Sequence, residues 1–141
     1  SLALAQAAEE SGWGTSRFSL EGNAIFGEWT FSQSNGLVPL HRGVGKFHRV
    51  RAFNSLLDSV RAYALNLNTH NAYRKFRLLR QKIRDSGLQI RGRQLIDTLG
   101  SYSERGTDYL KGIRAIIGAN KLDPLDDAKL SETQIEVRPV I

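Results

Sequence analysis

The strongest constraint on the fold is a helical spacing of apolar side chains that recurs in four segments from residue 55 onward. Side chains that repeat at intervals of three and four lie on one face of an α-helix and can pack into a shared core. Gly87 and Gly100 follow two of these segments, and glycine commonly ends a helix. The pattern therefore predicts helices over residues 55–69, 72–85, 92–100 and 107–118.

The first third of the chain predicts one more helix and a small β region. Residues 1–11 are rich in alanine and leucine, and Gly12 and Gly14 follow them. Residues 25–31 and 46–53 are dense in residues that favour strands, with a polar turn between them. We therefore expect an α+β fold that is mainly α, with a β-hairpin or irregular lobe across residues 25–53.

Length and composition favour one folded domain with a short tail. The chain has 141 residues, and we expect a domain over 1–122 followed by an acidic, weakly ordered tail over 123–141. There is no cysteine, which excludes disulfides and thiolate metal sites, and no apolar stretch is long enough to span a membrane. The chain begins without methionine inside a predicted helix, so we expect a truncated N-terminus, and the lack of a visible signal peptide says little.

The charge is concentrated in the middle of the chain. Residues 41–100 carry thirteen basic and three acidic side chains. Such a block favours an anionic partner, which includes nucleic acid, a membrane surface or an anionic polymer. It also fits a solvated helix face that binds nothing, and composition alone leaves both interpretations open.

The segment with the clearest chemical content ends the first predicted helix. Glu10 lies in the last turn, where the negative end of the helix dipole disfavours an ionised carboxylate, and Trp13 follows three residues later. Burial beside an aromatic ring would also raise the pKa, giving the neutral acid that a glycosidase uses to protonate its leaving group. From these local features alone, an exposed glutamate pair before a glycine cap is the commoner outcome.

Residues 5–16, Ala-Gln-Ala-Ala-Glu-Glu-Ser-Gly-Trp-Gly-Thr-Ser, resemble the signature of the glucosaminidase family, glycoside hydrolase family 73. The segment Asn23-Ala24-Ile25-Phe26-Gly27 is similar to the Phe-Gly turn of that family, and Gly100-Ser101-Tyr102 is similar to its Gly-Tyr segment. Phe53, Ser59, Tyr63 and Tyr73 fit its later pattern, and residues 28–39 resemble one bacterial branch. The resemblance covers about residues 2–118.

The resemblance implies a lysozyme-like helical domain that hydrolyses peptidoglycan as an endo-β-N-acetylglucosaminidase acting on β-1,4 bonds. It places the general acid on Glu10, a cleft tyrosine on Tyr102 and a neighbouring tyrosine on Tyr109. We accordingly expect a monomeric enzyme of the periplasm or cell envelope that binds glycan strands, with no nucleic acid partner and no cofactor. The alternative is a non-catalytic peptidoglycan-binding module; a nucleic-acid-binding domain ranks last, because the aromatic residues near the basic block fall at core spacing.

One departure concerns the second carboxylate that family members often carry on the β lobe. Residues 37–53 contain no Asp or Glu, and Glu28 does not align with that acid. Glu28 could position water from another place, this branch could be weakly active, or the 2-acetamido group of the substrate could be the nucleophile. We favour the third, with Tyr102 orienting the acetamido group or stabilising the oxocarbenium-like state.

Candidate substrate-binding residues are mostly aromatic. Flat apolar rings can stack on sugars, so Trp13, Phe26, Trp29 and Tyr109 are candidates together with Glu28. For Phe26 we favour a core position and for Trp29 the edge of the cleft, while Trp13 fits either. The three histidines, His41, His48 and His70, are too scattered to predict a metal site.

Overall fold

The computed structural model describes residues 1–32, 34–40, 43 and 45–129. His41 and residues 130–141 of the expected tail lie outside this range, so the predicted weak order of those residues stays a prediction. Within it, the α-helices are α1 (Leu2–Ser11), α2 (Arg17–Gly22), α3 (Leu56–Thr69), α4 (Arg74–Asp85), α5 (Gly92–Leu95) and α6 (Thr107–Ala119). The strands are β1 (Trp29–Thr30), β2 (Gly36–Leu37) and β3 (Arg49–Arg51), and three 3-10 helices are η1 (Asn71–Tyr73), η2 (Ile96–Leu99) and η3 (Asp123–Asp127).

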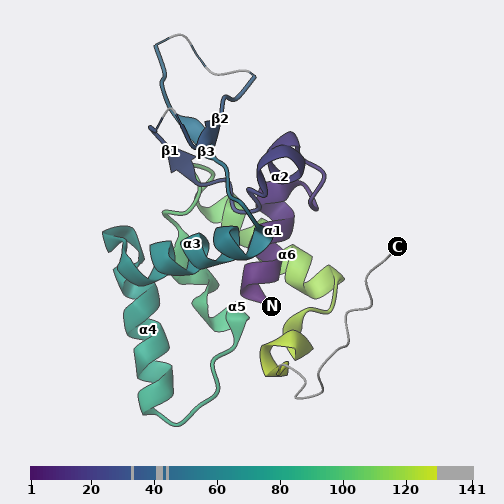
Figure 1. The fold of residues 1–141 in the computed structure, drawn as a ribbon. Coiled ribbons are helices and arrows are strands. Elements are labelled where there is room, and N and C mark those ends of the chain that lie inside the picture. The colour runs from purple at the N-terminus through teal and green to yellow at the C-terminus, as the bar shows by residue number, and fades with distance from the viewer. Residues whose placement is uncertain (33, 41–42, 44, 130–141) are drawn as a thin grey trace.

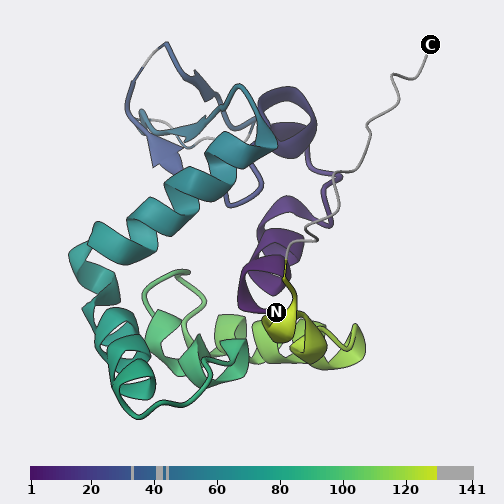
Figure 2. The ribbon, with the colours of Figure 1, turned by 60° about the horizontal axis from the view of Figure 1, so that its bottom comes forward.

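The helices form a body around α1 and α6, and the strands form a lobe at one end of it (Figure 1). Helix α3 runs from this lobe to the far side of the body, where it meets α4 (Figure 2). The predicted apolar faces turn inward, and Ala5, Ile96, Leu99, Ile113 and Ile117 are completely buried. The prediction of a mainly helical α+β fold is therefore confirmed.

The β lobe differs in detail from the predicted hairpin. It is a three-stranded antiparallel sheet in the order β1-β3-β2, with Trp29 opposite Val50 and Gly36 opposite Arg51. Strand β2 was missed because two residues carry no periodic pattern. A Cβ on Gly36 would lie 2.7 Å from the Cβ of Arg49, so only glycine fits where β2 meets the central strand.

Helix α2 was also missed, since its six residues are too short to show a helical repeat. Its N-cap is Ser16, whose side chain accepts a hydrogen bond from the backbone of Ser19. Asn23 follows it with a positive φ of 50°, and the Asn23 amide donates to the carbonyl of Phe53 at 3.0 Å. This bond joins the start of the lobe to its end.

The expected tail begins with a packed turn. In η3, the Asp126 carboxylate accepts from the Ser1 hydroxyl at 2.9 Å and from the backbone of Gly92 at 2.8 Å. These bonds connect η3 to the N-terminal ends of α1 and α5. Among the residues that the structure describes, no helix combines the length and apolarity needed to cross a bilayer.

Candidate active site

Glu10 lies in the last turn of α1, directly before a turn of unusual backbone conformation. Gly12, Trp13 and Gly14 all have positive φ, at 57°, 59° and 79°. Two glycines adopt this conformation freely, but a tryptophan in it is strained. The turn is held by hydrogen bonds from the Trp13 backbone to the carbonyl of Ala8 at 2.8 Å and from the Gly14 backbone to the Ser11 hydroxyl at 2.7 Å.

The carboxyl of Glu10 is half-buried where the helical body meets the lobe. A Cβ built on Gly27 would lie 3.6 Å from Glu10 Oε2, so the Phe-Gly turn passes close to the acid. Burial raises the pKa of Glu10, and the negative charge of Glu9 acts in the same direction. A hydrogen bond with Tyr109 and the charge of Arg105 oppose the rise without cancelling it.

All four tyrosines of the chain lie in one cluster of rings, and the charge of Glu10 acts on three of them, Tyr73, Tyr102 and Tyr109. Tyr102 stacks on Tyr109 with ring centroids 5.7 Å apart, and its ring also contacts those of Tyr63 at 6.4 Å and Tyr73 at 6.0 Å. The Tyr102 hydroxyl donates to the carbonyl of Phe26 at 3.4 Å. Burial raises the pKa of Tyr102, so its hydroxyl remains a neutral hydrogen-bond donor.

A buried amide connects two of these tyrosines. Gln6 is 0% exposed and lies one helical turn before Glu10. Its Nε2 donates to the Tyr109 hydroxyl at 2.8 Å, and its Oε1 accepts from the Tyr63 hydroxyl at 2.7 Å. Both ends of the amide are therefore used inside the core.

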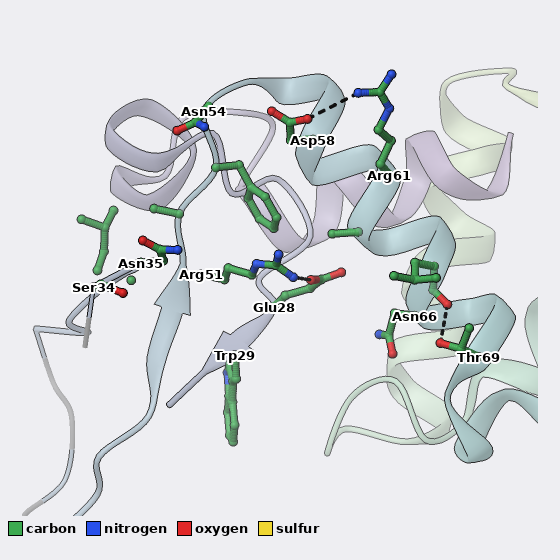
Figure 3. Close-up of a pocket in the computed structure, with 16 residues that line it drawn as sticks. Glu28, Trp29, Ser34, Asn35, Arg51, Asn54, Asp58, Arg61, Asn66 and Thr69 are labelled. Atoms are coloured by element: carbon green, nitrogen blue, oxygen red, sulfur yellow. Dashed lines mark hydrogen bonds and ion pairs between the residues drawn. The ribbon is translucent and has the colours of Figure 1, made fainter. Parts of the chain in front are cut away.

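Glu28 lines a groove of about 1010 Å³ between the lobe and α3 (Figure 3). Its Oε2 lies 3.8 Å from the Arg51 guanidinium, whereas its Oε1 is buried and has no hydrogen-bond partner in the described structure. Burial raises the pKa of Glu28, and the charge of Arg51 opposes that rise. Buried polar atoms almost always have a partner, so this oxygen is a candidate to bind a water molecule.

The groove is lined mostly by polar side chains, with Glu28 and Arg51 between the strands and α3 (Figure 3). Glu10 is not among its lining residues, but its carboxyl lies beside Gly27, which immediately precedes Glu28. The negative charges of Glu10 and Glu28 both raise the pKa of Tyr73, after the larger effect of burial. The lining side chains beyond the lobe include Asp58, Arg61, Asn66 and Thr69 of α3.

The predicted aromatic residues separate into core and surface. Phe26 is 5% exposed and stacks on Tyr63 with centroids 3.9 Å apart, so its ring belongs to the core, as favoured, and does not face a ligand. Tyr109 is completely buried and can act on a ligand only through Glu10. Trp13 and Trp29 are each 62% exposed, and Trp29 both lines the groove and stacks on His48 at 4.4 Å.

The sequence predicted Glu10, Tyr102 and Tyr109, and the structure brings all three together. It did not predict the link through Gln6, because a single polar residue on an alanine-rich helix carries no spacing signal. It also missed Arg105, which pairs with Glu9 and lies over the Tyr109 ring at 5.5 Å. The lining residues on α3 were missed because they fall between the apolar core positions of the helix, and the sequence pattern was used only to find that core.

Comparison with known proteins agrees with these features. The family model described as mannosyl-glycoprotein endo-beta-N-acetylglucosaminidase, Glucosaminidase, matches residues 1–122. The protein Bax of Escherichia coli strain K12 is 36% identical over 109 residues, which are 77% of this chain and 38% of Bax. The chain thus spans less than half the length of this relative, whose branch is the one that residues 28–39 resemble. No solved structure matches the chain.

Proposed function

Because this chain belongs to the glucosaminidase family, a family of glycoside hydrolases, we propose that it cleaves β-1,4 N-acetylglucosaminyl bonds of peptidoglycan. In this proposal Glu10 is the general acid that protonates the leaving oxygen. The substrate and the family relationship together favour export of the protein and action in the cell envelope.

The observation that carries the proposal is the environment of Glu10. A general acid must hold its proton near the working pH and must reach the bond that breaks. Burial raises the pKa of Glu10, and a Cβ built on Gly27, the residue before the groove-lining Glu28, would lie 3.6 Å from Glu10 Oε2. Loss of the Glu10 proton should therefore set the alkaline limb of the pH–rate profile, at a pH above the ordinary glutamate pKa.

The anomeric carbon also needs a nucleophile, and two groups are candidates. The substrate's own 2-acetamido oxygen can attack that carbon, with the neutral Tyr102 hydroxyl orienting the acetamido group. The unpartnered Oε1 of Glu28 favours a second arrangement, in which Glu28 positions a water molecule. A substrate bearing a 2-trifluoroacetamido group separates them, because fluorine weakens that carbonyl oxygen as a nucleophile.

If the acetamido group attacks, the fluorinated substrate reacts at least about a hundredfold more slowly, and Tyr102→Phe lowers kcat while Glu28→Gln does so less. If Glu28 acts on water, fluorination has little effect and Glu28→Gln causes the large loss. General acid–base groups contribute roughly 10²–10⁴-fold to rate, so the two patterns are distinct.

The proposed function is tested with intact sacculi, the parent protein and Glu10→Gln, with soluble products identified by mass spectrometry. The parent should release fragments with reducing N-acetylglucosamine ends, and Glu10→Gln should release none above background. A parent that sediments with sacculi but releases nothing would contradict the proposal and favour a non-catalytic binding module. Glu9→Gln, which changes the adjacent carboxyl, is the matched control and should still cleave.

A further inference from the structure

We propose that the outward face of α4 binds the surface of an anionic lipid bilayer. This face carries four exposed basic residues, Arg74, Lys75, Lys82 and Arg84. Neither Glu10 nor the groove takes part, since none of the α4 residues, all of which the structure describes, lines the groove. Membrane attachment can therefore hold or fail independently of the proposed cleavage.

Helix α4 has one side in the core and the other side open to solvent. Phe76 and Ile83 are buried, and the helix contacts α3, α5, η1 and η2. It lies at the edge of the body, where it meets the end of α3 (Figure 2). Because side chains three, four and seven residues apart share one face of a helix, the four basic residues spread over the side away from Phe76 and Ile83. All four are exposed there.

The positive charges of this face have no partner within the protein. None of the ion pairs that the described residues form involves α4, although six of its twelve residues are basic. Two of the six, Arg77 and Arg80, donate hydrogen bonds to residues 67–70. In the part of the chain that the structure describes, the other four side chains form no hydrogen bond, and Asp85, the one acidic residue of α4, pairs with none of them.

Helix stability accounts for only part of this charge. Lys82 and Arg84 lie in the last turn, where the negative end of the helix dipole stabilises cations. Arg74 and Lys75 lie in the first turn, where the positive end of the dipole disfavours them. Burial lowers the pKa of Arg80 most, and the positive charges of two neighbouring arginines lower it further, so the basic residues of α4 repel one another. An anionic partner would offset this repulsion.

The chemistry of the face favours a bilayer over a sugar polymer or a nucleic acid. The only aromatic residue of α4, Phe76, is buried, so the face offers no ring on which a sugar or a base could stack. Leu78 is 53% exposed and lies one helical turn from three of the basic residues. Lipid headgroups can bind the charges while a leucine enters the boundary between headgroups and acyl chains. A cluster of basic residues on an amphipathic helix is typical of binding to anionic lipids.

The test measures binding of the protein to vesicles of equal parts phosphatidylglycerol and phosphatidylcholine, with pure phosphatidylcholine vesicles as the reference without net charge. The parent should bind the anionic vesicles, and added salt should weaken that binding. Lys75→Gln combined with Lys82→Gln should weaken it roughly tenfold or more, since each basic residue near an anionic surface contributes about fivefold. Lys111→Gln combined with Lys129→Gln removes the same charge from exposed positions outside α4, so this matched control should bind like the parent.

Two further measurements separate a bilayer from an anionic polymer. Leu78→Ser keeps the net charge and should weaken binding to the anionic vesicles several-fold, because it removes the apolar side chain that enters the bilayer. Sedimentation with intact sacculi should be the same for the parent and for the variant that lacks Lys75 and Lys82.

No binding to the anionic vesicles, equal binding to both kinds of vesicle, or equal losses in the two lysine pairs would overturn the proposal. A lysine pair on α4 that is needed for sacculi but not for vesicles would also overturn it and would assign the face to a wall polymer. The substituted side chains are exposed, so thermal unfolding should show that every variant is folded. Because vesicle binding needs no turnover, a parent that binds through α4 but does not cleave refutes the proposed function alone.

Discussion

The two sides of the candidate site are built in opposite ways. On the helical side, Gln6 and Tyr109 are completely buried, and both the amide nitrogen and the amide oxygen of Gln6 have a hydrogen-bond partner. On the lobe side, Trp29 is 62% exposed and Phe31 and Phe47 are each 77% exposed. The lobe strands are only two or three residues long.

This difference matches two separate tasks. A general acid works only if its proton is held in one place, which requires neighbours that are themselves fixed by packing. A polymeric substrate needs an open groove in which a stretch of the chain can lie, and a buried pocket cannot offer this. We therefore expect changes on the helical side to act on stability and kcat, and changes on the lobe side to act on KM.

Tyr109→Phe should produce the largest effect on the helical side. It removes the hydroxyl to which Gln6 Nε2 donates and leaves that buried nitrogen without its acceptor. An unsatisfied buried group costs roughly 1–3 kcal/mol, so the free energy of unfolding in urea should fall by that amount, and kcat should fall with it. Unchanged stability would mean that this network does not hold the helical side together.

Gly36→Ala should damage the lobe alone. The new Cβ would lie 2.7 Å from the Cβ of Arg49 and 2.8 Å from Thr30, so β2 must move away from the central strand. We expect KM to rise by about tenfold or more, while the thermal unfolding midpoint falls by only a few degrees, since the helical core is untouched. A kcat loss with unchanged KM would break the proposed division between the two sides.

Trp29→Ala should have a smaller effect of the same kind. The ring lines the groove and stacks on His48, and a lost aromatic contact is worth about 0.5–1.5 kcal/mol. KM for glycan should therefore rise roughly threefold to tenfold, with no measurable loss of stability. Leu20→Ala, at a 74% exposed position outside the groove, is a control that should leave KM unchanged.

Glu10→Gln should change stability slightly, and in a pH-dependent way. The pKa of Glu10 is raised in the folded protein, so its contribution to stability is full below the unfolded pKa and is lost as the pH rises through the folded pKa. The glutamine variant should match the parent near pH 4 and unfold a few degrees higher at neutral pH. A variant less stable than the parent at neutral pH would show that the ionised carboxylate is not disfavoured there.

The sequence predicted the helical side better than the lobe. Helix α3 was expected over 55–69 and spans Leu56–Thr69, because its apolar repeat and the capping Ser55 are local signals. Strand β2 and helix α2 were not expected, since pairs of residues and a six-residue helix depend on tertiary contacts such as the packing of Gly22 against Leu37 and Ala52.

The candidate site divides in the same way. Glu10 and Tyr102 were found by motif, yet the motif did not show that Tyr63, Tyr73 and Tyr109 converge on the same place from α3, η1 and α6. Convergence of distant segments is a property of packing and has no local sequence signal. The partnerless oxygen of Glu28 is likewise visible only once its surroundings are built.

The central claim, that Glu10 is a general acid, is tested most directly by changing the leaving group. Parent and Glu10→Gln are compared on natural glycan and on the same sugars attached to 2,4-dinitrophenol, which departs without protonation. The account predicts a loss of about 10²–10⁴-fold on glycan and a rate within roughly tenfold of the parent on the activated substrate. An equally large loss on both substrates would contradict it, because Glu10 would then be needed for something other than donating a proton.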